Sequence, residues 1–368
     1  MCYIQFKIII ELKTFKLTFT GDLFPGNIIE SVGVGIASKF SIHNGNPWKK
    51  NLSKIFSDSD FNFINLESPL ISNNLNPELN SFAGSTDFAK FLQNVGVNAA
   101  SIANNHILEH GKKGFMSTIK ALNDSSILPI GINENGNSKI QEFKIENITI
   151  GIIGYNNIHD IYNDLHYANY NKQDVFKDLK RMELKKYDYK IISVHWGDEY
   201  VNIPSSQQII DARSFIDKGA DIVVGHHPHT IQPFEEYNGG VIFYSLGNFM
   251  SDMIWSKKIR MGGIANIYLN KENIIKTDLT TVHIDDDFIP KKRVDLIFDK
   301  FLFSNKEFLN TFNLSTKKLY DKNYFSLVKK KSLLNRFLMK KILIKNWFKI
   351  PKSQRRIFLK SIINRFKI

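Results

Sequence analysis

The chain has 368 residues, 43% of them hydrophobic, which is enough for one large folded domain with an extension. Its single cysteine, Cys2, excludes an intramolecular disulfide. The formal net charge of +13 is concentrated at the carboxyl end: residues 291–368 hold 22 Lys and Arg against 4 Asp and Glu, and the remaining residues hold 27 against 32. The sequence has no P-loop and no dinucleotide-binding fingerprint, so nucleotide use is not indicated.

Short apolar runs followed directly by polar side chains recur along the chain and are predicted strands. These runs are Phe15 to Thr20, Phe61 to Leu66, Asn98 to Ala103, Lys190 to Val194, Asp221 to Gly225 and Val241 to Leu246. Helical periodicity lies between them, at Thr86 to Val95, Lys112 to Asn123, Asp174 to Lys186 and Ser206 to Lys218. The alternation predicts an α/β fold. Because ligand sites of open α/β folds lie at the carboxyl ends of strands, we expect the polar residues there to form one site.

The most informative stretch is DIVVGHHPH, from Asp221 to His229, where a strand-like run ends in three histidines within four residues. Residues two apart on an extended segment point the same way, so His227 and His229 can offer two imidazoles to one point. That geometry is typical of metal ligands. Pro228 fixes φ and removes a backbone donor, which favours a strand end. The alternative is a histidine-rich loop without a ligand.

Each of the other strand-end residues also has an ordinary explanation. Asp22 precedes Leu-Phe-Pro-Gly and suits a turn, and Glu67 suits a solvated strand end. Asn104 and Asn105 suit a loop, because Asn tolerates left-handed backbone, and His195 suits a buried core position. Only the whole set, with oxygen or imidazole donors after successive strands, predicts a metal site.

The ordered motifs make a family resemblance specific. They are GD (Gly21, Asp22), NLE (Asn65 to Glu67), ANNH (Ala103 to His106), HWGxE (His195 to Glu199), GHHPHTIQ (Gly225 to Gln232) and YSLGNF (Tyr244 to Phe249). In this order they resemble the poly-gamma-glutamate capsule synthesis (CapA) family, a branch of the calcineurin-like metallophosphoesterases. The resemblance implies a four-layer α-β-β-α sandwich, which we place at residues 15–290. The basic residues 291–368 are then a helical tail.

Carried over by position, the resemblance implies a set of metal ligands and a catalytic acid. The implied ligands are Asp22, Glu67, Asn105, His195, His227 and His229, and the implied acid near the leaving group is His106. Asn104, Glu199 and Asn248 are expected to contact the ligand side chains or the substrate. The expected cofactor is one or two divalent ions of Mn, Zn, Fe or Mg. His226 is expected to point elsewhere, since strand alternation uses His227 and His229.

The sequence departs from the phosphoesterase pattern at three points. Phe24 stands where the Asp-x-His start has its histidine, and Glu67 replaces the usual aspartate. Glu109 and His110 stand where the CapA pattern has an aspartate after ANNH. These three departures bear on how many metal ions the site holds and on whether the protein is catalytically active.

The resemblance implies a role in the biosynthesis of a capsule, poly-gamma-glutamate or another cell-surface polymer, and two classes of function stay open. One is a metal-dependent hydrolase acting on an envelope polymer or a phosphoester. The other is a non-catalytic assembly or export subunit with a degenerate metal site. The expected partners are the polymer or its precursor and subunits of a polymer synthase.

The tail has no acidic residue after Asp321, and its apolar residues recur at helical spacing among lysines. These apolar residues are Leu333, Leu334, Phe337, Leu338, Ile342, Leu343, Trp347 and Phe348. The pattern predicts a helix on an anionic membrane surface, and the alternative is a helix packed on the domain; nucleic acid is disfavoured. The amino terminus has only Ile8 to Ile10 as an unbroken apolar run, too short for a signal peptide or a transmembrane span. We therefore expect a cytoplasmic protein, peripheral at the inner membrane face if the tail binds lipid.

Overall fold

A computed structural model describes residues 13–159, 166–293, 309, 312–313, 315–350, 355–356 and 359. The amino-terminal run Ile8 to Ile10 and Cys2 lie outside these residues. In the ranges that the structure describes, no helix is both long enough and apolar enough to cross a membrane.

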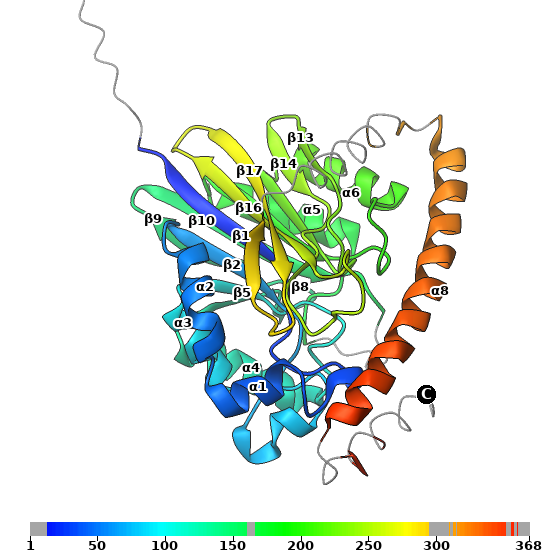
Figure 1. Cartoon of the computed structure of the whole chain (residues 1–368). Helices are drawn as coiled ribbons and strands as arrows, with labels where there is room; N and C mark the ends of the chain where they lie inside the picture. The colour runs from blue at the N-terminus through cyan, green and yellow to red at the C-terminus, as the bar shows by residue number, and fades with distance from the viewer. Residues whose placement is uncertain are drawn as a thin grey trace, which may run out of the picture.

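Two β-sheets lie face to face, with helices on their outer sides (Figure 1). The first sheet has the order β18-β17-β16-β1-β2-β5-β6, with β15 also paired to β1, and the second has the order β13-β14-β12-β11-β10-β9. The strands of the first sheet are β1 (Phe15–Leu23), β2 (Phe61–Leu66), β5 (Ala99–Ser101), β6 (Leu128–Ile130), β15 (Asn248–Met250), β16 (Met261–Leu269), β17 (Ile274–Ile284) and β18 (Pro290–Arg293). Those of the second are β9 (Gln141–Ile145), β10 (Ile148–Asn156), β11 (Tyr189–His195), β12 (Ile222–His226), β13 (Phe234–Tyr237) and β14 (Gly240–Phe243). Two small pairs, β3 (Leu70–Ile71) with β4 (Gly84–Ser85) and β7 (Asn133–Glu134) with β8 (Asn137–Ser138), lie apart from them.

Alternation along the strands divides the core into layers. Phe15, Leu17 and Phe19 of β1 point into a cluster that also contains Ile150 of β10 and Val224 of β12, so this cluster lies between the sheets. A second cluster joins the first sheet to α1 (Ile36–His43), α2 (Asn46–Phe56), α3 (Asp87–Asn94) and α4 (Gly111–Asp124). A third joins the second sheet to α5 (Lys172–Leu184) and α6 (Ser206–Asp217). The predicted four-layer α-β-β-α sandwich is therefore confirmed, as are the four predicted helices.

The strands that carry the candidate site run parallel. β1 pairs in parallel with β2, β2 with β5, β10 with β11 and β11 with β12. The carboxyl ends of both sets meet at the same edge of the sandwich, where His195 of β11 lies 3.3 Å from Glu67 after β2. The predicted strands are all present, with three larger differences: β1 continues to Leu23, so that Asp22 lies inside it, β5 covers only Ala99–Ser101, and β14 ends at Phe243.

The tail forms α8 (Lys317–Lys349), which runs along one side of the sandwich (Figure 1). At its start Tyr320 is buried, and its hydroxyl donates to the Pro204 carbonyl at 2.7 Å. Farther along, Leu338, Met339 and Ile342 pack against a buried aromatic cluster of the domain. The apolar residues that recur at helical spacing in the tail therefore do not form one stripe, because part of them face the domain and part face solvent. The predicted domain boundary at residues 290 and 291 remains a prediction and falls within β18.

Asp252 is a fully buried carboxyl group that joins the segment after β15 to the loop after β1. Its Oδ2 accepts hydrogen bonds from the Ile28 backbone N–H, at 3.1 Å, and from the Ser31 hydroxyl. Burial raises the pKa of Asp252 from 3.8 to about 7, although the two hydrogen bonds oppose the shift.

This raised pKa makes stability depend on pH. Because the pKa of Asp252 is higher in the folded than in the unfolded chain, protonation stabilises the fold at low pH, and the stabilisation is lost as the pH rises through about 7. We expect Asp252→Asn to exceed the wild type in free energy of unfolding at pH 8 by about 2–4 kcal/mol, with the difference shrinking toward pH 4. Urea unfolding of both proteins between pH 4 and pH 8 measures this difference in the free energy of unfolding. A difference independent of pH would contradict the assignment.

Candidate metal centre

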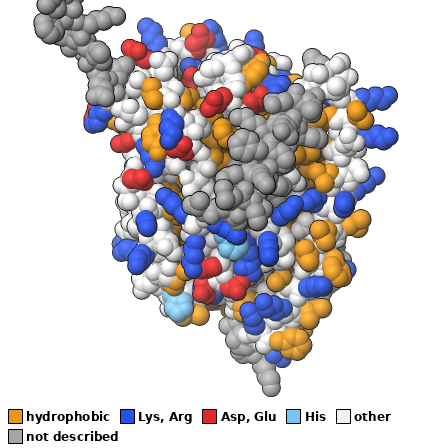
Figure 2. All heavy atoms as spheres, turned by 45° about the horizontal axis from the view of Figure 1, so that its top comes forward, with side chains coloured by type: hydrophobic (Ala, Val, Ile, Leu, Met, Phe, Trp, Pro, Cys, Tyr) orange, Lys and Arg blue, Asp and Glu red, His pale blue; other side chains and the backbone are white. Residues whose placement is uncertain are grey.

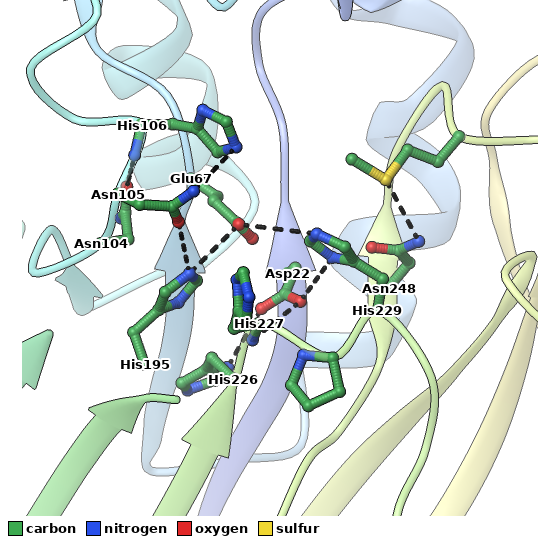
Figure 3. Close-up of polar contacts among 12 residues, drawn as sticks. Asp22, Glu67, Asn104, Asn105, His106, His195, His226, His227, His229 and Asn248 are labelled. Carbon is green, nitrogen blue, oxygen red and sulfur yellow. Dashed lines mark hydrogen bonds and ion pairs between the residues drawn. The ribbon is translucent and has the colours of Figure 1, made fainter. Parts of the chain in front are cut away.

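Polar side chains from both sheets gather at the carboxyl ends of β1, β2, β11 and β12 (Figure 3). The approach of β1 to the segment before β15 depends on Gly21, where a Cβ would lie 1.9 Å from the Gly247 carbonyl oxygen. The Asp22 N–H donates to that same oxygen at 2.8 Å. In the paired strands, Asp22 stands level with Asn65 of β2 and Asn248 of β15. A buried carboxylate is thus fixed between two amides.

Asp22 is held by donors from both sheets. Its Oδ2 lies 3.0 Å from His229 Nδ1, and its Oδ1 accepts from Asn65 Nδ2 at 2.9 Å. Its Oδ1 also lies 3.3 Å from His226 Nδ1. Burial alone would raise the pKa of Asp22, but hydrogen bonding to His226 and His229 outweighs burial and holds that pKa well below its usual value. Asp22 is therefore ionised at neutral pH.

Glu67 follows β2 and is buried next to imidazole nitrogens of the second sheet. Its Oε1 lies 3.3 Å from His195 Nε2 and 3.8 Å from His229 Nε2. Burial, reinforced by the negative charge of Asp22, raises the pKa of Glu67 well above its usual value. A second carboxylate so close to Asp22 is costly unless positive charge compensates it.

The loop after β5 brings the asparagines and His106 to the same place. Asn105 Oδ1 lies 2.9 Å from His195 Nε2, and Asn105 Nδ2 lies 3.2 Å from His106 Nε2. Asn104 donates to the Leu66 carbonyl at 2.9 Å and accepts from the His106 N–H at 3.2 Å. Asn104 therefore fixes this loop to the end of β2 and has a positioning role.

His106 is held on two sides in addition to its contact with Asn105. Its Nδ1 lies 3.1 Å from Glu109 Oε1, and its ring stacks on Phe82 with 4.1 Å between centroids. Glu109, which stands where the CapA pattern has an aspartate, thus contacts and orients the His106 ring. Phe82 could not be assigned from the sequence, because it lies in a loop far from any motif.

His227 and His229 come together by a different route from the one expected. β12 ends at His226, and His227 and His229 have φ angles of 95° and 53°, so neither is extended. Their ring centroids lie 5.7 Å apart, and the His195 and His227 centroids lie 4.9 Å apart. Burial lowers the pKa of His227 to about 4, so this imidazole is neutral and able to bind a metal ion.

The expectation that His226 points elsewhere is wrong. Its Nδ1 faces Asp22 Oδ1 (Figure 3). The reason is the strand register: His226 stands level with His195 of β11, at the last position where β12 still follows the alternation. His226 thus orients the Asp22 carboxylate.

Three further residues complete the surroundings. Asn248 donates to the Ile259 carbonyl at 3.0 Å, while its Oδ1 is buried without a hydrogen-bond partner in the described structure. Burial would raise the pKa of Glu199, but the nearby histidines, His227 first, lower it, so Glu199 adds negative charge to the site. The Phe24 ring lies 5.6 Å from that of His229 and 6.1 Å from that of His106. It fills with apolar atoms the place where the phosphoesterase pattern has a histidine.

The donor atoms form two overlapping groups that share Glu67. Ligand atoms of Asp22, Glu67 and His195 all lie within 4.8 Å of one another, and so do those of Glu67, His227 and His229. Within the described residues, Glu67 Oε1, His227 Nδ1 and His229 Nε2 are buried without a hydrogen-bond partner. Buried polar atoms are rarely left so, and carboxylate with imidazole is a donor set that suits a divalent transition metal. The residues present therefore fit one or two such ions.

The four-layer sandwich thus has parallel strands that end in carboxylate, amide and imidazole donors, as the resemblance to the metallophosphoesterases implies. The family model described as "Bacterial capsule synthesis protein PGA_cap" matches residues 16–253. The chain belongs to this family.

Similar proteins carry related names. A "Capsule biosynthesis protein CapA" of Bacillus anthracis is 28% identical over 274 residues, covering 67% of this chain and 62% of that protein. A "PGA biosynthesis protein CapA" of Bacillus subtilis (strain 168) is 28% identical over 296 residues, covering 75% and 74%. The chain therefore spans less than two thirds of the first relative. Among solved structures, the calcineurin-like phosphoesterase YfkN from Bacillus subtilis has a TM-score of 0.43 at 11% identity, covering 81% of this chain and 98% of that one.

Proposed function

We propose that this chain is a metal-dependent hydrolase that acts in the synthesis of a capsule, poly-gamma-glutamate or a related cell-surface polymer, on an envelope polymer or a phosphoester. The polymer context comes from the family and from the names of its relatives. The observation that carries the chemistry is the set of buried donors around Glu67 that lack hydrogen-bond partners among the described residues. Expected partners are the polymer or its precursor and polymer synthase subunits.

The proposed ligands are those that the family resemblance implies. Asp22, Glu67, Asn105, His195, His227 and His229 would hold the ion or ions, and Mn, Zn, Fe and Mg are the candidates. A bound divalent ion would lower the pKa of a bound water and stabilise negative charge on the group being transferred.

His106 supplies the other half of the proposed chemistry. Its imidazole sits beside Asn105 and is oriented by Glu109 at 3.1 Å and by the stacked Phe82 ring. An imidazole fixed in this way can deliver a proton to a departing oxygen, and Glu109 holds its orientation. Because His106 is still partly exposed, a substrate can reach it.

The second candidate is a non-catalytic assembly or export subunit. The observation that favours it is the Phe24 ring, which stands between His106 and His229 in place of a metal-binding imidazole. A site with one ligand fewer can bind metal or polymer without turnover.

Metal reconstitution followed by hydrolysis assays tests the proposal. We expect the chelator-stripped protein to regain one or two divalent ions per chain, with a rise in Tm, because ligand at 100 times Kd adds about 2.7 kcal/mol to the free energy of unfolding. Only the loaded protein should hydrolyse bis-p-nitrophenyl phosphate, γ-glutamyl oligomers or glycan phosphates. Full metal content without turnover on any of them favours the assembly subunit. Failure to bind Mn²⁺, Zn²⁺, Fe²⁺ or Mg²⁺ contradicts the metal centre itself.

A further inference from the structure

α8 carries apolar side chains on two opposite faces. The inner face packs on the domain through Leu338, Met339 and Ile342, whose neighbours include Tyr200 and Trp255. The outer face presents four large side chains to solvent: Leu333 is 69% exposed, Phe337 57%, Ile344 62% and Phe348 74%. Their spacing of four, seven and four residues places all four on one line along the helix. Within the described residues, nothing covers this line.

Basic residues flank the outer line. The exposed Lys and Arg side chains of the helix are Lys318, Lys322, Lys329, Lys330, Arg336, Lys340, Lys341, Lys345 and Lys349. Lys341 Nζ lies 4.7 Å from the centroid of the Phe337 ring. The sequence has no acidic residue after Asp321 that could neutralise this face. Figure 2 shows hydrophobic and basic side chains interleaved along the side of the molecule where α8 runs.

We propose that the outer face of α8 docks on the surface of an anionic lipid bilayer. The helix has 33 residues, so it can lie along about 50 Å of membrane, and its many lysines fit the headgroup region. The exposed leucine, isoleucine and phenylalanine side chains would enter the boundary with the acyl chains. The cationic side chains of the outer face would then contact anionic headgroups, and its apolar side chains would contact acyl chains.

Other occupants match only one of these halves. A second copy of the chain would bring two strongly basic faces together, and like charges across an interface are repulsive. A polyanionic polymer would neutralise the lysines but leave the apolar line in water. An anionic membrane surface satisfies both.

Docking would also place the candidate metal centre near the membrane. The inner face of α8 is tied to loops of the site, because Tyr324 donates to Asp198 at 2.8 Å, next to Glu199. Trp255 donates to Asn335 of the helix at 2.9 Å. Such docking requires binding alone and does not depend on hydrolase activity.

Vesicle co-sedimentation of the full chain tests the proposal. Vesicles of phosphatidylcholine with phosphatidylglycerol should bind the wild type at least about tenfold more tightly than phosphatidylcholine alone, because each basic residue contributes about fivefold near an anionic surface. Binding should weaken between 0.1 and 1 M salt, where the Debye length falls from about 10 Å to about 3 Å. Equal binding to both vesicle types, or none, overturns the proposal.

Matched variants locate the surface. The outer-face variant Leu333→Gln/Phe337→Gln/Phe348→Gln should lose binding at least about tenfold. The control Ile42→Gln/Met116→Gln/Leu184→Gln removes three exposed apolar side chains from other elements and should bind as the wild type does. Two further variants test the contribution of charge. The α8 charge variant is Lys340→Gln/Lys341→Gln/Lys345→Gln, and its control is Lys49→Gln/Lys50→Gln/Lys112→Gln. All these positions are exposed, so Tm should stay nearly constant.

Three results would overturn the assignment of this face to lipid. If the outer-face variant still binds vesicles, a different surface of the protein binds the lipid. A dimer in sedimentation velocity that this variant dissociates, without vesicle binding, would identify a self-interface. Retention on immobilised poly-gamma-glutamate but not on vesicles, abolished by the α8 charge variant alone, would identify a polymer surface.

Discussion

Replacing His227 with alanine should abolish tight binding of a divalent metal ion and leave the fold intact. His227 Nδ1 is buried without a hydrogen-bond partner in the described structure, beside Glu67 and His229, and its lowered pKa keeps it neutral. We expect the affinity for Mn²⁺ or Zn²⁺ to fall more than about 100-fold, because even residues that only orient ligands contribute about 10–100-fold. Competition with a chromophoric chelator measures the affinity, and elemental analysis measures the retained metal.

Two other histidines provide the comparison. His226→Gln should cause a smaller loss, within about 10–100-fold, because His226 Nδ1 faces the Asp22 carboxylate and His226 lies outside both groups of ligand atoms around Glu67. His43 is exposed at the end of α1, so His43→Ala should bind metal as the wild type does. Equal losses from the His226 and His227 variants would show that both imidazoles bind the ion. Unchanged affinity in the His227 variant would exclude it as a ligand.

The layers of the fold could be predicted because their signals are local. Alternating runs specify β1 and β2, and α6 begins with a capping box in which Ser205 and Gln208 hydrogen-bond to each other's backbone. α1 and α2 were not predicted. They begin after Gly35 and Gly45 without a side-chain cap, so α1 has no capping signal and α2 has only Pro47 in its first turn.

The membership of the candidate site could be predicted, but the direction of each side chain could not. Parallel strands bring their carboxyl ends together whatever the loops do, which is why Asp22, Glu67 and His195 meet. The loop after β12 is different, since the positive φ angles of His227 and His229 depend on tertiary packing. Asn65 had a usable signal: it lies two residues before Glu67, so alternation places it on the same side.

The same limit applies to α8. Residues such as Leu333 and Leu338 recur at spacings that fit one helix, and periodicity alone cannot tell a buried line from an exposed one. Only the position of the domain shows that Leu338 packs inward and Leu333 outward.

If the chain is a hydrolase, His106→Asn should lower turnover by about 10²–10⁴-fold while leaving metal content unchanged. The asparagine can still contact Asn105, but it cannot donate a proton to a departing oxygen. Neither of the two overlapping groups of ligand atoms contains His106, so the variant should keep its bound metal. Steady-state kinetics with bis-p-nitrophenyl phosphate, together with elemental analysis of the same samples, separates the two effects.

His110 offers a matched control from the same loop. It is partly buried like His106, but its Nε2 faces the Ser81 carbonyl at 3.0 Å, away from the donor groups. His110→Asn should therefore keep turnover within a few-fold of the wild type. Glu109→Gln should fall between the two, because it weakens the orientation of His106 without removing the imidazole. Turnover that is unchanged in the His106 variant would remove this residue from the mechanism and leave proton delivery to solvent.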